Sequence, residues 1–251
     1  MTSLNIVMLS TIFDIIFPKF CLSCNREGFY VCPACFAKIP LKKGVCCYIC
    51  GKRSPNGKTC IACKTKTSSK LTGLLIASDW NNMLVRQMIY EFKYRFIKEL
   101  SNPLAEILIK FLEINKFFNS LNHKPINLQT NNKFILIPVP LHKRRLSWRG
   151  FNQSELLALK LNKYFKIPII NNLLFRAKNT SPQMEIKDQM QRIKNVSGAF
   201  KIKGQNENPL RNKSVILVDD ICTTAATFEN CAAALKPLKP KEIWGLALAR
   251  G

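Results

Sequence analysis

The sequence is short of acidic side chains. Asp and Glu number 15 against 39 Lys and Arg in 251 residues, which gives a formal net charge of +24 at pH 7. An excess of this size favours a polyanionic partner such as nucleic acid, and a merely basic surface is the alternative. Enrichment in Lys alone would not explain why so few acids are present.

A long hydrophobic run is also missing. The apolar residues 4–17 form a stretch of only about 14 residues, interrupted by Asp14, which is too short to cross a bilayer. The stretch has neither the basic start nor the small-residue cleavage site of a secretory signal. It predicts a short helix within residues 1–20 that packs on the body of the protein, with attachment to a membrane surface as the alternative.

Cysteine, in contrast, is plentiful. Nine of the 11 cysteines lie between Cys21 and Cys63, and eight of them form Cys-x2-Cys pairs. Each pair can present two thiolates to a tetrahedral ion, so four pairs predict two structural Zn²⁺ ions in a reducing compartment. The predicted ligands are Cys21, Cys24, Cys32, Cys35, Cys47, Cys50, Cys60 and Cys63. The spacing leaves open which pairs share an ion, and Cys46 is spare.

Residues 21–64 contain few large apolar side chains, so a core alone would not fold them. Bound metal would supply the stability, and we expect a separate zinc-binding domain here. The polar, basic residues 64–70 are the expected linker to a second domain at 71–251.

The second domain centres on a buried strand followed by two acids. Val215–Val218 are apolar, Asp219 and Asp220 follow, and a turn of small and hydroxylic residues leads into helical spacing from Phe228. Such a turn presents backbone N–H groups at the carboxyl edge of a sheet, where anions bind. The acids would repel phosphate but can accept hydrogen bonds from a sugar diol, directly or through a divalent cation. An ordinary buried strand with a capping Asp is the alternative.

Strand and helix patterns alternate through this domain. Their order predicts an α/β fold with a doubly wound, mainly parallel sheet flanked by helices. The expected strands are 71–78, 134–140, 167–170, 215–218 and 242–249, and the expected helices are 80–100, 103–114, 152–165 and 228–236. The Asn-rich residues 115–133 suggest an exposed insertion, and residues 174–200 suggest a mobile lid.

A basic segment follows the strand expected at 134–140. Lys143, Arg144, Arg145 and Arg149 lie within seven residues, close to Trp148 and Phe151. Cations mixed with aromatic rings suit a ligand that carries phosphates and bases. We expect these four cations to bind pyrophosphate or DNA from a loop, and a solvated basic loop is the alternative.

The acid pair and its turn resemble the signature of type I phosphoribosyltransferases, which bind phosphoribosyl pyrophosphate (PRPP) with Mg²⁺. The resemblance implies that the two acids grip the ribose hydroxyls and that the loop wraps the 5-phosphate. It assigns PRPP binding to Asp219, Asp220, Cys222, Thr223, Thr224, Ala225, Ala226 and Thr227. Ala225 departs from the usual Gly, and Ala penalises a positive φ.

The order of motifs along the chain resembles a narrower family. These motifs are the Cys pairs, Phe92-Lys93-Tyr94, Pro138-Val139-Pro140, Arg149-Gly150-Phe151-Asn152-Gln153, Arg192-x2-Asn195 with Gly198-Ala199-Phe200, and Val218-Asp219-Asp220. Together they resemble the ComF family of competence proteins in its double zinc ribbon form. The resemblance implies a cytoplasmic factor of natural transformation that handles incoming single-stranded DNA and carries a PRPP-binding domain. It also implies uptake helicases or recombination proteins as partners.

Three functions therefore compete. The first is a single-stranded DNA-binding competence factor with a PRPP/Mg²⁺ site. The second is an active phosphoribosyltransferase on a nucleobase or amine, for which the sequence shows no nucleobase pocket and no assignable catalytic residue. The third is a regulator in which PRPP switches DNA or partner binding.

Overall fold

The computed structural model describes residues 18–118, 133–179, 197–204 and 207–251. Most of the N-terminal helix expected within residues 1–20 lies outside these ranges, as do residues 119–132 of the expected insertion and residues 180–196 of the expected lid. Within the described part of the chain, every helix is too short or too polar to span a lipid bilayer.

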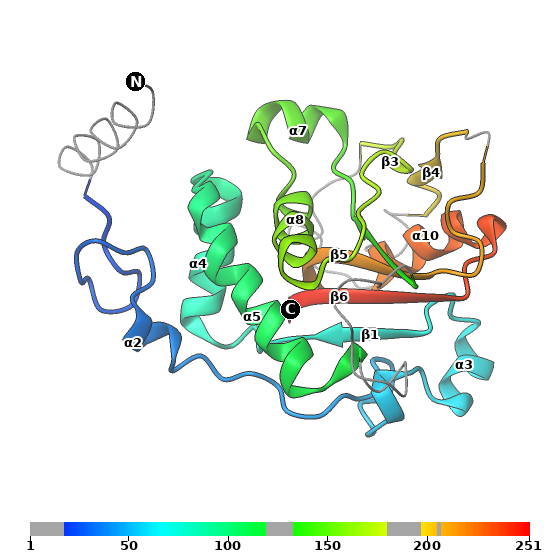
Figure 1. The fold of residues 1–251 in the computed structure, drawn as a ribbon, viewed down its shortest axis with the longest axis horizontal. Helices are drawn as coiled ribbons and strands as arrows, with labels where there is room; N and C mark the ends of the chain where they lie inside the picture. Colours follow the sequence, from blue (N-terminus) through cyan, green and yellow to red (C-terminus); the bar gives the residue numbers. More distant parts are fainter. Residues whose placement is uncertain (1–17, 119–132, 180–196, 205–206) are drawn as a thin grey trace.

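A four-stranded parallel sheet forms the centre of the protein, as the sequence predicts (Figure 1). Its spatial order is β1-β6-β5-β2. The strands are β1 (Gly73–Ile76), β6 (Glu242–Arg250), β5 (Ser214–Cys222) and β2 (Phe134–Pro138). Val215–Val218 of β5 are at most 1% exposed, which is expected for a central strand covered on both faces.

Two hydrophobic layers cover the two faces of the sheet. Alternate residues of β5 enter different layers, with Ile216 and Val218 in one and Val215 and Leu217 in the other. Helices α4 (Met83–Tyr94), α5 (Ser101–Ile114) and α8 (Gln153–Phe165) supply the first layer. Helix α10 (Ala226–Leu235) and the antiparallel pair β3 (Leu174–Arg176) and β4 (Phe200–Ile202) supply the second.

Two local predictions were wrong. The expected basic loop is a helix, α7 (Lys143–Arg149), because the His142 side chain caps its first turn and Gly150 ends it at φ 74°. Its long unbranched side chains also favour a helix. The strand expected at 167–170 is only an isolated bridge between Ile169 and Leu136.

Other boundaries moved by a few residues. The helix expected over 80–100 divides into α4 and a 3-10 turn, η2 (Lys98–Leu100), with Phe96 at φ 60° between them. Half of the expected linker is helical, since α3 (Ile61–Thr67) extends into it. The start of the expected exposed insertion is buried, because Phe117 and Phe118 are only 2% and 3% exposed.

The cysteine-rich segment contacts the sheet through its second half, which packs along the edge strand β1. It contains two further short helices, α2 (Pro33–Phe36) and η1 (Pro55–Gly57). A bridge pairs Lys58 with Gly73 at the start of β1, and a Cβ at Gly73 would lie 2.3 Å from the carbonyl oxygen of Gly57. This close approach of two backbones requires glycine.

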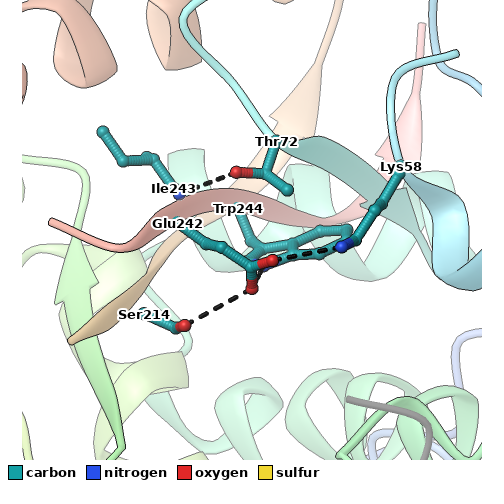
Figure 2. A network of polar contacts seen from close by, with 6 residues as sticks. All are labelled: Lys58, Thr72, Ser214, Glu242, Ile243 and Trp244. Atoms are coloured by element: carbon teal, nitrogen blue, oxygen red, sulfur yellow. Dashed lines mark hydrogen bonds and ion pairs between the residues drawn. The ribbon is translucent and has the colours of Figure 1, made fainter. Parts of the chain in front are cut away.

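A carboxylate at the start of β6 joins this segment to β5 and β6 (Figure 2). One Glu242 oxygen pairs with the Lys58 ammonium at 3.2 Å, and the other accepts from Ser214 Oγ at 3.4 Å and from Trp244 Nε1 at 3.1 Å. Beside it, the Ile243 amide donates to Thr72 Oγ1 at 3.0 Å. Trp244 is fully buried, so Glu242 satisfies an indole N–H that water cannot reach.

We expect Glu242→Ala to destabilise the protein by about 1–3 kcal/mol, because it leaves the buried indole N–H of Trp244 without an acceptor. Lys58→Ala should cost less than about 1 kcal/mol, because the Lys58 side chain is 46% exposed. Urea unfolding of both variants measures the difference. Equal losses would show that the ion pair, and not the indole contact, provides the stability.

Candidate anion-binding pocket and metal centres

A cavity of about 110 Å³ opens at the carboxyl ends of β5 and β2. Its walls come from α4, the β2–α7 connection, α7, the start of α8, β3 and the turn after β5. They include six of the predicted site residues, Arg145, Arg149, Asp219, Asp220, Thr223 and Thr227. Segments that are distant in sequence therefore meet above one edge of the sheet, as expected for a parallel α/β fold.

The acid pair lies within β5 and does not terminate it. Asp219 Oδ1 accepts from Ser154 Oγ at 2.7 Å and from the Asp220 amide at 2.9 Å. Asp220 Oδ1 pairs with Lys93 Nζ at 2.9 Å, and its Oδ2 is buried without a hydrogen-bond partner. Burial, and next the charge of Asp220, raise the pKa of Asp219 to about 7. The pair thus offers one unsatisfied acceptor atom in a poorly solvated setting.

Arg149 supplies unsatisfied donors to the same cavity. Its side chain is 8% exposed, and Nε and Nη1 are buried without a hydrogen-bond partner. Burial lowers the pKa of Arg149, an effect that the nearby Asp220 carboxylate opposes. The guanidinium carbon lies 5.9 Å from the centroid of the Tyr94 ring. A buried guanidinium with open N–H groups beside a cavity is suited to an anionic ligand.

The five-residue motif 149–153 forms the side of the cavity that carries Arg149. Gly150 ends α7 at φ 74°, and Phe151 packs on Phe92 with ring centroids 5.3 Å apart. The Asn152 side chain donates to the Val139 carbonyl at 3.1 Å and caps α8 by accepting from the Ser154 amide at 3.1 Å. It therefore joins the end of β2 to α8, and α8 in turn carries the Ser154 hydroxyl that contacts Asp219.

Only some of the residues predicted in the turn after β5 line the cavity. Thr223 and Thr227 line the cavity, whereas Cys222, Thr224, Ala225 and Ala226 do not. Ala225 has φ 64°, so it occupies the left-handed conformation for which Gly is the usual choice. Burial raises the pKa of Cys222 to about 11, which keeps this thiol protonated and a poor nucleophile.

Likewise, only some of the predicted cations of α7 line the cavity. Arg149 and Arg145 line the cavity, whereas Lys143 and Arg144 are exposed and lie outside it. His142 is buried. Burial is the main cause that lowers the pKa of its ring, and the positive charge of Arg144 is the next, so the ring is neutral as it caps α7.

Several cavity residues were not identified as site residues from the sequence. Lys93 and Tyr94 come from α4, Gln153 from α8 and Arg176 from β3. Lys93 and Tyr94 appeared only as part of the family pattern Phe92-Lys93-Tyr94. Arg176 lies in a segment without periodicity, so no pattern distinguished it from other surface cations.

Two clusters of four thiols form the predicted metal centres. In each cluster all Sγ atoms lie within 4.8 Å of one another, and the members are Cys21, Cys24, Cys32 and Cys35, and Cys47, Cys50, Cys60 and Cys63. The Cys24–Cys32 and Cys50–Cys60 Sγ separations are 3.6 and 3.8 Å. Thiolates bound tetrahedrally to zinc at about 2.3 Å would lie about 3.8 Å apart. The donor sets therefore fit Zn²⁺, the pairs combine in sequence order, and Cys46 belongs to neither cluster.

Hydrogen bonds join the second metal centre to α10, the helix that follows the turn after β5. The Tyr48 hydroxyl, next to Cys47, donates to Glu229 in the first turn of α10. Glu229 also accepts from Ser69 Oγ at 2.7 Å, and Arg250 donates to the Tyr48 carbonyl at 2.6 Å. Contacts of this kind fix the N-terminal turn of α10 against the metal-binding segment.

Comparisons with known proteins agree with this arrangement. Residues 12–64 match the double zinc ribbon domain. The chain is 41% identical to competence protein F of Haemophilus influenzae over 119 residues, which is 45% of this chain and 50% of that protein. It is 25% identical to competence protein ComFC of Bacillus subtilis over 210 residues, which is 82% of this chain and 77% of that protein.

The chain is therefore similar to competence proteins of the ComF type. It is also 28% identical to the DNA utilization protein YhgH of Escherichia coli O157:H7 over 59% of each chain. The aligned segment spans only half the length of the Haemophilus relative. Both elements of the ComF resemblance, the N-terminal zinc ribbons and the α/β domain, are therefore confirmed.

We expect the purified protein to contain two zinc ions per chain. Cys35→Ser and Cys63→Ser should each lower this to one, and each lost site should cost on the order of 10 kcal/mol in local stability. Cys46→Ser is the matched control and should retain both ions. Metal analysis of the three variants decides the matter, and a single ion lost in Cys46→Ser would contradict the assignment of ligands.

We expect Asp219→Asn to stabilise the ligand-free protein more at pH 8 than at pH 5.5. Because the folded-state pKa of Asp219 is raised to about 7, ionisation of its carboxyl costs stability as the pH rises towards that value. The gain should increase by about 2 kcal/mol across this range. Thermal unfolding at both pH values measures it, with the exposed Asp79→Asn as control. A gain independent of pH would refute the raised pKa.

Proposed function

We propose that the cavity binds a ribose 5-phosphate ester of the PRPP class. The observation that carries this proposal is that one pocket contains buried, unsatisfied groups of both polarities. Asp220 Oδ2 needs a donor, and Nε and Nη1 of Arg149 need acceptors. A sugar diol supplies hydroxyl donors and a phosphate supplies acceptors, so a sugar phosphate satisfies both sets.

The remaining lining supports the same class of ligand. Asp219 and Asp220 would accept from the ribose hydroxyls, and Thr223 and Thr227 would donate to the 5-phosphate from the turn before α10. Arg145, Arg149 and Arg176 would take the pyrophosphate. The enclosed volume of about 110 Å³ holds the sugar and one phosphate, so the rest of the ligand would extend towards the open rim.

Mg²⁺ fits this site by its chemistry. Carboxylate and phosphate oxygens are the ligands that Mg²⁺ prefers, and Asp219 and Asp220 are the carboxylates of the cavity. A bound Mg²⁺ would neutralise part of the ligand's charge. The two acids would orient the sugar, and the threonines and arginines of the cavity would hold the phosphates.

We further propose that the protein serves DNA uptake and binds single-stranded DNA in the cytoplasm. Its similarity to competence proteins and to a DNA utilization protein supports this role. The outer face of α7 supports DNA contact. Lys143 and Arg144 are exposed there, and Trp148 is 60% exposed with its ring 5.0 Å from that of Phe96. Cations beside exposed rings suit a flexible strand, whose phosphates pair and whose bases stack.

Helix α7 thus gives a test with two separable outcomes. Arg149→Ala should weaken PRPP/Mg²⁺ binding by about tenfold or more in calorimetry, because it removes charge-assisted hydrogen bonds. The paired change Lys143→Ala with Arg144→Ala should leave PRPP binding unchanged. In single-stranded DNA binding the same double variant should flatten the slope of log K against log salt by about 1.4, or about 0.7 per phosphate contact.

Each arm can fail separately. Undetectable PRPP binding by the zinc-loaded wild type, or full affinity in Arg149→Ala, would refute the sugar-phosphate site. An unchanged DNA salt slope in the double variant would show that α7 is not the DNA contact.

A further inference from the structure

Tyr48 connects the second metal centre to both ends of the turn that follows β5. It directly follows Cys47, one of the four ligands, and is only 8% exposed. Its hydroxyl donates to Glu229 in the first turn of α10, where the turn after β5 ends. Its carbonyl accepts from Arg250 Nη1 at 2.6 Å, and Arg250 pairs with Cys222, where the turn begins. One residue beside a metal ligand therefore contacts the elements on both sides of the turn.

Glu229 also receives contacts from the other half of the metal centre. Its Oε1 accepts from Ser69 Oγ at 2.7 Å, and its Oε2 accepts from the Lys70 amide at 2.8 Å. Both donors follow α3, the helix that carries the ligand Cys63. The segments that follow the first and the last ligand of this centre thus converge on a single carboxylate, and a Zn²⁺ ion held by all four thiolates would fix the two segments relative to each other.

The turn that these contacts enclose carries two hydroxyls of the anion-binding cavity. Thr223 and Thr227 line that cavity, and Glu229 lies two residues beyond Thr227. The Glu229 amide donates to the Ala225 carbonyl at 2.9 Å, and Ala225 holds φ 64°. A residue other than Gly in this conformation costs free energy and persists only where its surroundings fix it. Contacts that hold the first turn of α10 should therefore also hold the two threonines in place.

We propose that the second metal centre regulates the anion-binding cavity through Tyr48 and Glu229, which act as positioning residues. While the two Cys pairs are held together, Tyr48 and Ser69 converge on Glu229 and keep the turn after β5 in its observed shape. When the pairs separate, the turn loosens and the threonine hydroxyls lose their positions. The effect on a PRPP-class ligand rests on the proposed function of the cavity. Because such a coupling is reciprocal, the bound ligand should also slow the release of zinc.

Tyr48→Phe tests the coupling without touching a metal ligand or the cavity. It removes one hydroxyl, should keep both zinc ions, and should weaken PRPP/Mg²⁺ binding by about fivefold or more in calorimetry. Tyr164→Phe is the matched control, because the Tyr164 hydroxyl also donates to a glutamate, Glu113, at 2.5 Å but lies outside the cavity. It should keep the wild-type affinity.

Two further changes separate positioning from a general loss of stability. Glu229→Gln keeps an acceptor for the hydroxyls that converge on it, so it should weaken PRPP/Mg²⁺ binding less than Glu229→Ala does. In the wild type, saturating PRPP/Mg²⁺ should slow the release of one of the two zinc ions to a chelator by about fivefold or more, and Tyr48→Phe should lose this protection.

Hydrogen exchange tests the same coupling without any ligand. In the zinc-loaded protein, Tyr48→Phe should speed exchange over residues 222–230 by about tenfold, because opening this turn no longer breaks a hydrogen bond to a carboxylate. Cys63→Ser, which lacks the second ion, should speed it further, and Tyr164→Phe should leave it unchanged. Zinc content is measured on every sample. If Tyr48→Phe loses an ion, Glu229→Gln decides in its place, because Glu229 lies on α10, outside the metal-binding segment.

The proposal is overturned if Tyr48→Phe, with both zinc ions bound, keeps the wild-type exchange rate over residues 222–230. It is also overturned if the variant exchanges faster there but binds PRPP as tightly as the wild type. Faster exchange in a protein whose wild type does not bind PRPP would leave the coupling between metal centre and turn standing and refute only the sugar-phosphate site.

Discussion

The extension of β5 beyond the end of β2 is the constraint on which the anion-binding cavity depends. Pro138, the last residue of β2, pairs with Val218, while β5 continues to Cys222 beside β6 alone. Asp219 and Asp220 therefore stand where one neighbouring strand has ended. The missing neighbour leaves room above the sheet, and the helices on either side enclose that room without filling it.

Charge compensation makes this arrangement tolerable. Asp220 is 2% exposed, and a buried carboxylate would be costly without the Lys93 ammonium that contacts it. Around the cavity, Lys93, Arg145, Arg149 and Arg176 oppose two carboxylates, so the basic groups outnumber the acidic ones. A pocket with this balance attracts an anion. The cations favour ionised carboxylates, so the raised pKa of Asp219 comes from burial and from the charge of Asp220, which Lys93 opposes only in part.

The sequence predicted the parallel sheet, the metal ligands and the acid pair because each has a short-range signature. Val215–Val218 show a buried strand, and regular Cys spacing shows a metal site. Tertiary placement has no such signature. The contribution of Arg176 and the division of α7 into an inner and an outer face both depend on segments that are distant in sequence. The basic segment was predicted as a loop because its capping contacts, at His142 and Gly150, are weak signals beside its charge.

The two faces of α7 also give a physical route by which one ligand could affect another. Arg145 and Arg149 face the sugar-phosphate cavity, while Lys143 and Arg144 face solvent on the same short helix. An anion in the cavity would neutralise the inner charges and lower the potential at the outer ones, which lie within about two helical turns. DNA held by phosphate contacts to the outer cations would then bind less tightly, so a PRPP-class ligand would favour release of the strand.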